Sequence, residues 1–564
     1  MLGANAILGE VIRIELPKLA EADPLDLKVP GHPWAEFPDD PLHAAAGQFS
    51  WLHDAPSESY KRGVLSRDGG HFQAIFAGQS RAEAFVANAR DLLGRRLPSL
   101  RWEIRVESWL PDPADTTLDD AWKPLGRVET PDPSRSFFID DARPCDLTGT
   151  GVAEETIKIG TNEFRVTREV FDQWSRGPLV RRGRTQDIVG ALQRPGGETA
   201  LPCTGEGWDP DGPMDLQSIA GAGQYLALVH VDGNDVGGQV KRTLEGCDRT
   251  PGKPGESAAD AFQRWLSGEA TIESMFHANR ANLRAALVAT LKEIFGACSP
   301  ADFRGIAPYQ LLMLGGDDLL IVTRASYAMR FVASLARQLD AAVCESPYPL
   351  SFGAGVAIAR PSFPFHALHE LAEELTASSK HLARGTLASG QSVVDWMVVS
   401  QSNATSVLAN RRAHAIVRYA TQGRMERLVT VGRPYPVLSK QGCPIPSLES
   451  LLAATSTIDG AAKSFARSQR KALPDALRRG RRSGVAAIED LPTAARQVLI
   501  DAGLLATGTG RDPADPWVRL PGDGQDEANW ISYLPDALEL CEIPHLGRKA
   551  AGAEAPDLEP EVIE

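Results

Sequence analysis

Two adjacent carboxylates, Asp317 and Asp318, lie at the centre of an otherwise apolar segment, residues 311–322 with the sequence LLMLGGDDLLIV. Gly315 and Gly316 precede them, and glycine tolerates the positive φ that two-residue hairpin turns require. The pattern predicts two short strands joined by a turn, with the carboxylates at its tip or at the first residues of the returning strand. A turn that is only capped by its aspartates would use the same residue types, but strands this apolar favour a tip that faces a cleft.

A third carboxylate, Asp232, comes directly after another apolar strand, residues 225–231. If that strand lies beside the hairpin in one sheet, Asp232 meets Asp317 and Asp318 at one end of it. Three carboxylates at one point repel each other unless cations join them, and oxygen ligands suit Mg²⁺ or Mn²⁺. Two such ions about 4 Å apart would hold the attacking and leaving oxygens of a phosphoryl transfer.

The segment that begins at Asp232, DGNDVGG (232–238), contains three glycines: Gly233, Gly237 and Gly238. The backbone N–H groups of such a loop can hold phosphate groups. Together with the carboxylates, the loop predicts a site for a nucleoside triphosphate. The alternative is a plain turn between a strand and a helix.

The elements that must position these residues follow a ferredoxin-like order, β-α-β-β-α-β-α-β. The predicted strands and helices of this α+β core are 225–231, 271–296 (helix), 309–314, 318–323, 326–343 (helix), 350–359, 365–384 (helix) and 392–399. Residues 221–400 are therefore expected to form the catalytic domain.

The rest of the chain divides at Pro- and Gly-rich stretches. Residues 1–110 contain a strand, a helix and a strand (71–78, 80–96 and 101–107) and are expected to form an N-terminal α/β domain, and 111–220 a linker or insertion. Strand patterns fade after 401. Helices are predicted at 410–422, 447–456 and 484–506, so 401–548 is expected to be a helical C-terminal domain, followed by a disordered acidic tail at 549–564.

Length, charge and cysteine content exclude several classes of protein. The 564 residues are too many for one core and predict two to four domains. The net charge of −14 argues against a protein coated in nucleic acid. No apolar run has the ~18–20 residues of a membrane span, so no membrane partner is expected. Seven scattered cysteines form no C-x-x-C pair, and the N-terminus does not look like a signal peptide, which together predict a cytoplasmic protein.

A strand ending in Asp-Gly, a later Gly-Gly-Asp-Asp hairpin and the segment SFGAGVAIARPSFPFHALHELAEELTASSK (351–380) resemble the second palm domain of the type III CRISPR large subunit, the Cas ten or Cmr two family. The resemblance covers about 222–400. It implies a cyclic oligoadenylate synthase related to GGDEF and class III nucleotidyl cyclases, which uses ATP as substrate. It also implies that the fragment at 71–107 is a degenerate, inactive first palm.

By this resemblance, Asp232, Asp317 and Asp318 match the metal-binding, catalytic acids, and the glycines of both turns match nucleotide-binding positions. Lys380 matches a lysine near the end of the palm helix and is expected to contact the triphosphate; a solvated helix lysine is the alternative. The family often has D-G-D-N after the first strand, whereas this chain has D-G-N-D, which leaves Asp235 open as ligand or bystander.

Other family features are missing from the sequence. Only His53-Asp54 offers the histidine–aspartate pair of the family's nuclease domain, and its Pro- and Ser-rich surroundings indicate chance, so no DNase activity is predicted. His230 and His381 have no motif support and are expected to be structural or surface residues. The zinc-binding cysteine clusters of relatives are absent as well.

A basic stretch, residues 463–484, places eight Lys and Arg among few acids. Contacts with RNA phosphates and a solvated helix face are both open interpretations. In the family, this region packs against neighbouring subunits near RNA. RNA, CRISPR-type protein subunits or further copies of the chain are therefore the expected macromolecular partners.

The sequence is compatible with two functions. The first is a Mg²⁺-dependent nucleotidyltransferase or cyclase that makes a cyclic oligonucleotide second messenger from ATP in antiviral defence. The second is a non-catalytic scaffold that binds nucleotide or RNA in a CRISPR-like complex. Three mutually repelling carboxylates favour the enzyme. A GGDEF-type dinucleotide cyclase would need Glu-Phe after the Asp, where this chain has Asp318-Leu319.

Overall fold

The computed structural model describes most of the chain. The described residues are 2–20, 63–109, 122–129, 143–182, 201–247, 258–399, 411, 416–439, 445–505, 515–520 and 527–546, without 68–69, 77, 99, 148–151, 160, 210–214, 222–224, 345, 386–389 and 422–423. The His53-Asp54 pair and the predicted acidic tail lie outside them. Within these ranges, no helix has the length and apolarity needed to cross a membrane.

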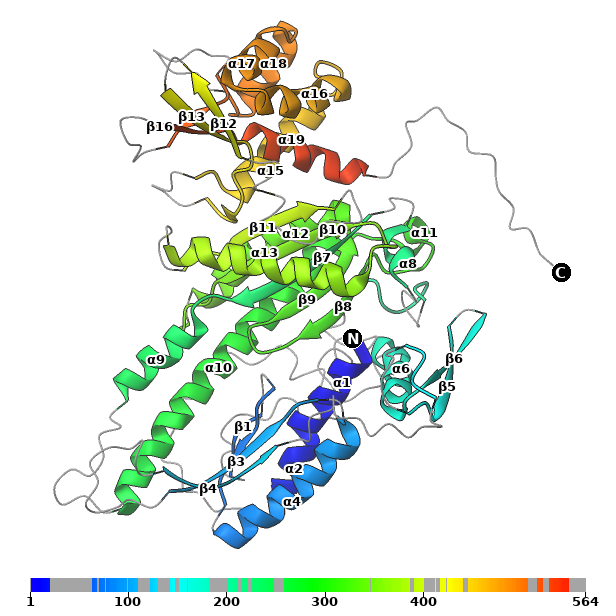
Figure 1. The fold of residues 1–564 in the computed structure, drawn as a ribbon, viewed down its shortest axis with the longest axis vertical. Coiled ribbons are helices and arrows are strands. Elements are labelled where there is room, and N and C mark those ends of the chain that lie inside the picture. The colour runs from blue at the N-terminus through cyan, green and yellow to red at the C-terminus, as the bar shows by residue number, and fades with distance from the viewer. Residues whose placement is uncertain are drawn as a thin grey trace.

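A six-stranded sheet forms the centre of the molecule (Figure 1). Its spatial order is β14-β11-β10-β7-β9-β8, and every neighbouring pair is antiparallel except β10 with β11. The strands are β7 (Leu226–Gly233), β8 (Tyr309–Leu314), β9 (Leu319–Arg324), β10 (Phe352–Ala359), β11 (Val393–Val398) and β14 (Tyr435–Pro436).

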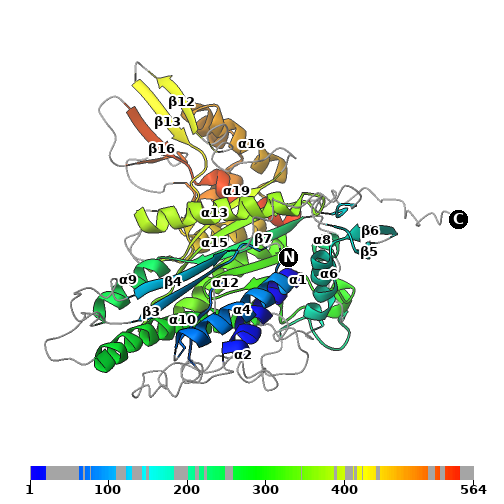
Figure 2. The same cartoon turned by 60° about the horizontal axis from the view of Figure 1, so that its bottom comes forward.

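Three long helices connect these strands in the order expected from the sequence, which confirms the α+β palm. They are α10 (Ala258–Phe295), α12 (Ala325–Val343) and α13 (Phe365–Gly385), and a further helix, α9 (Val236–Gly246), follows β7 without having been part of the predicted order. Helix α10 starts at 258, earlier than the predicted 271. Figures 1 and 2 show α9 and the first half of α10 extending together away from the sheet.

The two faces of the sheet bury different side chains because successive strand residues point to opposite sides. Ala227, Val229 and Val231 of β7 pack toward α10 and α12. Leu226 and Leu228 pack toward α13 and the short helix α8 (Leu216–Ala220). The same alternation places His230 and then Asp232 on the α13 side of β7.

The N-terminal unit is built from helices around short strand pairs. Its elements are α1 (Leu2–Glu10), η1 (Val11–Glu15), α2 (Leu16–Ala20), β1 (Val64–Ser66), β2 (Gln73–Ala74), α4 (Gln79–Arg96), β3 (Glu103–Trp109) and β4 (Trp122–Glu129). The predicted strand at 71–78 is only two residues long, and β4 pairs with β3 across the predicted boundary at 110. The described strands form separate two-stranded sheets, so the degenerate first palm stays a prediction.

Helix α1 connects this unit to two others. Asn5 donates a hydrogen bond to the carbonyl of Leu312 on the edge strand β8 (3.2 Å). Glu10 pairs with Arg96 of α4 and with Arg176 of α6 (Arg168–Arg181). Helix α6 follows a hairpin of β5 (Glu155–Ile159) and β6 (Asn162–Val166), which lies within the predicted linker.

The C-terminal unit is mainly helical, as expected, but the helix predicted at 484–506 forms as two helices, and the unit also contains a sheet that the sequence did not predict. The helices are α15 (Leu448–Gly460), α16 (Arg467–Arg478), α17 (Arg481–Glu489), α18 (Thr493–Asp501) and α19 (Leu534–Glu542). The sheet has the order β12-β13-β16-β15, with β12 (Ile416–Thr421), β13 (Arg424–Val429), β15 (Val518–Arg519) and β16 (Glu527–Ile531). The helix predicted at 410–422 is therefore wrong over 416–421, where the β-branched and aromatic residues of IVRYAT favour a strand.

A candidate active site at one end of the palm sheet

Strand register brings the three predicted carboxylates together. Val231 of β7 lies opposite Leu319 of β9, so the next residue along β7, Asp232, lies opposite Asp318. Carboxylate oxygens of Asp232, Asp317 and Asp318 all lie within 4.8 Å of one another. Among the described residues, they are the one group of three His, Cys, Asp or Glu side chains placed to share a metal ion.

The turn between β8 and β9 closes through a hydrogen bond from the N–H of Gly315 to the carbonyl of Asp318 (2.8 Å). Neither Gly315 nor Gly316 has a positive φ, so the conformational reason expected for these glycines is wrong. A Cβ added at Gly316 would meet no atom within 4 Å. The glycines leave open space beside the carboxylates, which a ligand can use.

Gly233 has a different role from the phosphate contact expected of it. A Cβ at this position would lie 2.6 Å from Oδ2 of Asp317 and 2.8 Å from its Cβ, both too close for a real contact. Only glycine therefore allows Asp317 to approach the end of β7. The residue after Asp232 is small because the hairpin carboxylate packs against it.

The acidic cluster carries an electrostatic cost. Burial, and then the charge of Asp232, raises the pKa of Asp317. Burial, together with the charges of Asp232 and Asp317, raises the pKa of Asp318 to about 7. Both shifts mean that the ionised carboxylates are unfavourable together without a compensating cation.

Lys380 supplies one positive charge at this point. Its ammonium group forms an ion pair with Asp232. Helix α13 can bring Lys380 there because Gly353 and Gly355 of β10 have no side chains: a Cβ at Gly353 would lie 2.8 Å from Cγ of Lys380, and one at Gly355 would lie 2.1 Å from the carbonyl oxygen of Ala372. Gly353 pairs directly with Asp232 in the sheet.

The loop after β7 separates Asp235 from the cluster. Asp235 adopts a left-handed conformation (φ 54°) immediately before α9, and its exposed carboxylate pairs with Arg242 (3.0 Å). A Cβ at Gly238 would lie 2.2 Å from Oδ1 of Asp235, whereas one at Gly237 would meet nothing within 4 Å. Gly238 thus accommodates Asp235, and the space at Gly237 is open.

Two residues near the site were not recognised from the sequence as contributors to its geometry. Asn234 forms three hydrogen bonds to the neighbouring strands β10 and β11, described below. Thr376 of α13 donates to the carbonyl of Ala372 (2.8 Å) and also lies 3.2 Å from the carbonyl of His230. Burial lowers the pKa of His230, and His381 is exposed, which agrees with structural and surface positions for these histidines.

The residues present fit divalent cations. The donors are all carboxylate oxygens, which suit hard cations such as Mg²⁺ and Mn²⁺. They lie close enough to share an ion, and two of them have raised pKa values that a bound cation would reverse. Asp232, Asp317 and Asp318 are the residues that would hold the metal.

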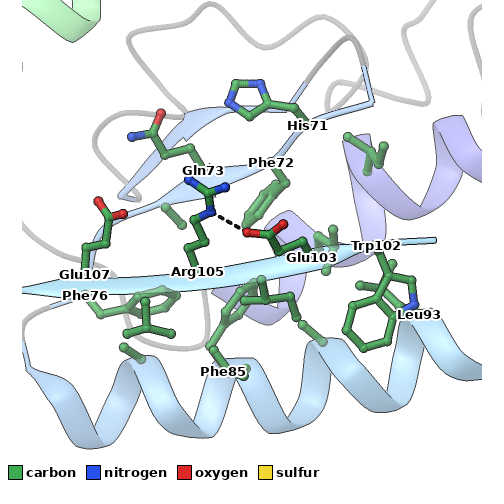
Figure 3. A pocket seen from close by; sticks show the side chains of 18 of the residues that line it. His71, Phe72, Gln73, Phe76, Phe85, Leu93, Trp102, Glu103, Arg105 and Glu107 are labelled. Carbon is green, nitrogen blue, oxygen red and sulfur yellow. Dashed lines mark hydrogen bonds and ion pairs between the residues drawn. The ribbon is translucent and has the colours of Figure 1, made fainter. Parts of the chain in front are cut away.

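A separate cavity lies in the N-terminal unit and has a different character (Figure 3). Its volume is about 1050 Å³, and Trp265 of α10 contributes to its lining. Phe85 packs against Phe72 and Phe76 at ring distances of 5.7 and 5.0 Å, while Arg105 pairs with an acidic neighbour at the rim. The cavity is lined mainly by apolar and aromatic side chains. The end of the palm sheet, which carries three acids and a lysine, is therefore the candidate site for phosphate chemistry.

Comparisons with known proteins agree with the fold of the palm. Residues 225–388 match the family model described as Cas10/Cmr2, second palm domain. No curated protein matches the chain. Two solved structures are distantly similar: a type III-B Cmr-beta complex in its apo state (11% identity, TM-score 0.28, 58% of this chain and 39% of that chain) and Csm1 of T. onnurineus (13% identity, TM-score 0.35, 91% of this chain and 67% of that one).

The chain thus spans well under half of the first of these two proteins. Both TM-scores are below 0.5, so the assignment rests on the family match, which contains all three clustered carboxylates and Lys380. Over residues 225–388, the chain therefore matches the second palm domain of the Cas10/Cmr2 family.

Proposed function

We propose that the chain is a nucleotidyltransferase that depends on divalent cations and converts ATP into a cyclic oligonucleotide. In such a reaction the hydroxyl of one nucleotide attacks the α-phosphate of another, a phosphodiester bond forms and pyrophosphate leaves. The observation that carries the proposal is the meeting of Asp232, Asp317 and Asp318 within 4.8 Å at the end of the palm sheet.

The chain's own residues have distinct roles in this proposal. The three carboxylates would hold two cations, and these would supply positive charge to stabilise the negative charge that develops on the reacting phosphate. Lys380 lies at the same point and is the side chain available to a triphosphate once Asp232 is occupied by a cation. In this proposal the N–H groups in the first turn of α9 would bind the phosphates, because the first N–H groups of a helix have no partner within the helix.

The open positions at Gly316 and Gly237 give a nucleotide access to these groups, since a Cβ at either would meet no neighbouring atom. Gly315, next to Gly316 in the turn, adds no side chain to block this approach. A site that combines three acids, a lysine paired with one of them and glycines without obstructing neighbours suits a triphosphate with its cations.

The test is product formation from each of the four nucleoside triphosphates with Mg²⁺ or Mn²⁺, with products resolved by mass. We expect a cyclic oligonucleotide from ATP, and no product in excess EDTA or with Asp317→Ala/Asp318→Ala. If the wild-type protein binds nucleotide tightly but forms no product with any partner added, the palm is a scaffold instead.

RNA and CRISPR-type protein subunits are the proposed partners. Within this proposal the palm acts in antiviral defence as part of an assembly, and the C-terminal unit, which carries the basic stretch, provides contacts for RNA or neighbouring subunits. Adding target RNA to the same assay separates an RNA-activated enzyme from a constitutive one, because only the first would gain product.

A further inference from the structure

Asn234 connects the end of β7 to the two neighbouring strands. Its backbone N–H donates to the carbonyl of Ser351 (2.8 Å). Its side-chain Nδ2 donates to Oγ of Ser351 (3.1 Å) and to the carbonyl of Gln391 (3.2 Å). Ser351 immediately precedes β10, and Gln391 lies two residues before β11, so one side chain joins three strands at the end that carries Asp232.

The surroundings of this amide are buried and polar. Ser351, Gln391 and Ser392 are each 5–6% exposed, and Ser392 accepts a hydrogen bond from the N–H of Phe352 (3.3 Å). The orientation of the Asn234 amide is fixed, because the carbonyl of Gln391 can only accept and must therefore face the NH₂ group. Asparagine is required here as a double donor, and no other small residue supplies two donors in this geometry.

The first turn of helix α9 is held from more than one side. None of its residues is fully buried, but Val236 packs against the palm core, and Asn279 of α10 donates to Oε1 of Gln239 (3.3 Å). Its first helical hydrogen bond runs from the N–H of Gln239 to the carbonyl of Asp235 (2.9 Å). The Gln239 side chain donates to the carbonyl of Pro349 (2.6 Å), two residues before Ser351. The segment 349–351 therefore holds the first turn of α9 at both ends.

We propose that Asn234 is a positioning residue that fixes the first turn of α9 beside the carboxylate cluster, so that its N–H groups and Asp232 meet the same triphosphate. This inference rests on the proposed function, which uses those N–H groups to hold phosphate. Asn234 itself contacts the strands and not the nucleotide. Its loss leaves the acids in place and moves the groups that bind phosphate.

The test uses two substitutions of Asn234 and a control on the same helix. Asn234→Ala removes both side-chain donors. Asn234→Asp keeps the shape but replaces the donor with a carboxylate that faces the Gln391 carbonyl, so a residue that only fills space would tolerate it. Arg242→Gln is the matched control, because it removes an exposed ion pair of α9 that does not involve the strands.

Two measurements on the full chain separate the possible outcomes. Amide hydrogen exchange of residues 235–239 is measured without nucleotide, and affinity for a non-hydrolysable ATP analogue with Mn²⁺ is measured by calorimetry. We expect both Asn234 variants to exchange at least tenfold faster and to bind at least tenfold more weakly, with Arg242→Gln within twofold of wild type and melting temperatures similar throughout.

Unchanged exchange in both Asn234 variants would overturn the inference, even if affinity fell, because the residue would then contact the ligand directly. Retention of wild-type exchange and affinity by Asn234→Asp would also overturn it, because shape alone would suffice. If the wild-type protein binds no analogue, the proposed function fails; faster exchange in the variants would still support the placement of α9 by Asn234.

Discussion

Asp317 and Asp318 are neighbours with different surroundings. Asp317 packs against the bare backbone of Gly233, which leaves it no freedom to move toward β7. Asp318 lies opposite Asp232 in the sheet register, and its pKa is raised to about 7 by burial and by the two other carboxylates. Adjacent acids at a turn tip therefore place two carboxylates with different neighbours within 4.8 Å of Asp232.

Replacing both hairpin acids tests whether they bind metal for catalysis or serve only to form the turn. Asp317→Ala/Asp318→Ala removes two anionic ligands and relieves their repulsion, so the metal-free fold should melt at or slightly above the wild-type temperature. Product formation should fall by several orders of magnitude, since stabilisation by metal charge is worth several kcal/mol and each ~1.4 kcal/mol is tenfold. Asp232→Ala should behave in the same way.

The matched control for this experiment is Asp235→Asn. Asparagine tolerates the left-handed conformation at this position, and the exposed Asp235 carboxylate pairs with Arg242 outside the cluster. We expect a much smaller loss than at Asp232. An equal loss would indicate that Asp235 also binds the metal. Wild-type turnover by the double mutant would show that Asp317 and Asp318 serve only to form the turn.

The raised pKa of Asp318 predicts how stability changes with pH. The folded state holds its proton up to about pH 7, whereas the unfolded state releases it near 3.8, so the free energy of unfolding falls as pH rises between these values. Without metal, Asp318→Asn should lack part of this fall, and the difference from wild type should widen toward pH 8. Saturating Mg²⁺ should raise the wild-type melting temperature more than that of the variant. Parallel melting curves at pH 5 and pH 8 would contradict the shift.

At the scale of elements, the palm could be predicted because its patterns are long and regular. The strand at 309–314 has the bounds expected from the sequence, and the helix at 365–385 is within one residue of them. The meeting of Asp232 with the hairpin followed from strand order. The placement of Lys380 could not be derived, because it depends on Gly353 and Gly355 letting α13 approach the sheet.

Other features depend on contacts that the sequence does not show. The hydrogen bonds of Asn234 join positions 117 and 157 residues apart. In the C-terminal unit, the strand at Ile416–Thr421 is stabilised by pairing with β13, and that sheet is completed by β16, about 100 residues further along the chain. Local periodicity was too short there to separate a strand from a helix.

The close approach of α13 to β10 predicts a strong effect of one added methyl group. In Gly355→Ala the Cβ would lie 2.1 Å from the Ala372 carbonyl oxygen and 2.6 Å from the Thr376 nitrogen, both backbone atoms that cannot turn away. We expect a loss of about 1–3 kcal/mol of unfolding free energy. Gly385→Ala, at the end of the same helix with no atom within 4 Å, is the control and should melt like wild type.

At the scale of the whole molecule, the basic stretch 463–484 divides into structural and surface residues. Arg481 pairs with Asp515 and lies 3.8 Å from the Trp530 ring, while Arg467 pairs with Glu542. These charges hold the C-terminal helices to each other and to the sheet. Four of the eight positive residues take part in such longer-range pairs, so the stretch is less available to RNA than the sequence indicates.

Substitutions within the stretch should therefore separate folding from RNA binding. Arg481→Ala should lower the unfolding free energy by about 1–3 kcal/mol, because it loses both an ion pair and a contact with an aromatic ring. Arg479→Gln/Arg482→Gln should leave melting unchanged, weaken RNA association and flatten its salt dependence. If the dependence of RNA affinity on salt concentration is unchanged, these two arginines are solvent-exposed residues that do not contact RNA.

The palm and the C-terminal unit share a buried cluster, which predicts that they unfold together. Arg433 pairs with Asp536 (3.2 Å) and Glu539 (2.6 Å) of α19, and its guanidinium lies 4.6 Å from the ring of Trp396 on β11. The Trp396 indole in turn donates to Glu539 (2.9 Å). In Figure 1, α15 and α19 lie between the palm and the helices α16, α17 and α18. Loss of Arg433 would leave two acids at this boundary without their cation.

Arg433→Met should therefore cost about 3–5 kcal/mol, far more than an exposed pair, because the Asp536 carboxylate stays buried without its cation. The measurement is chemical denaturation followed separately by probes in the palm and in the C-terminal unit. Arg337→Ala, which breaks an exposed pair with Glu293, should cost no more than about 1 kcal/mol. Adding Asp536→Asn to Arg433→Met should recover part of the loss, since it removes one unpaired charge. Two results would contradict the coupling of the two units by this cluster. One is separate unfolding transitions for the two probes in the wild-type protein, and the other is a cost of Arg433→Met no larger than that of Arg337→Ala. In either case the palm would be stabilised by its own core alone.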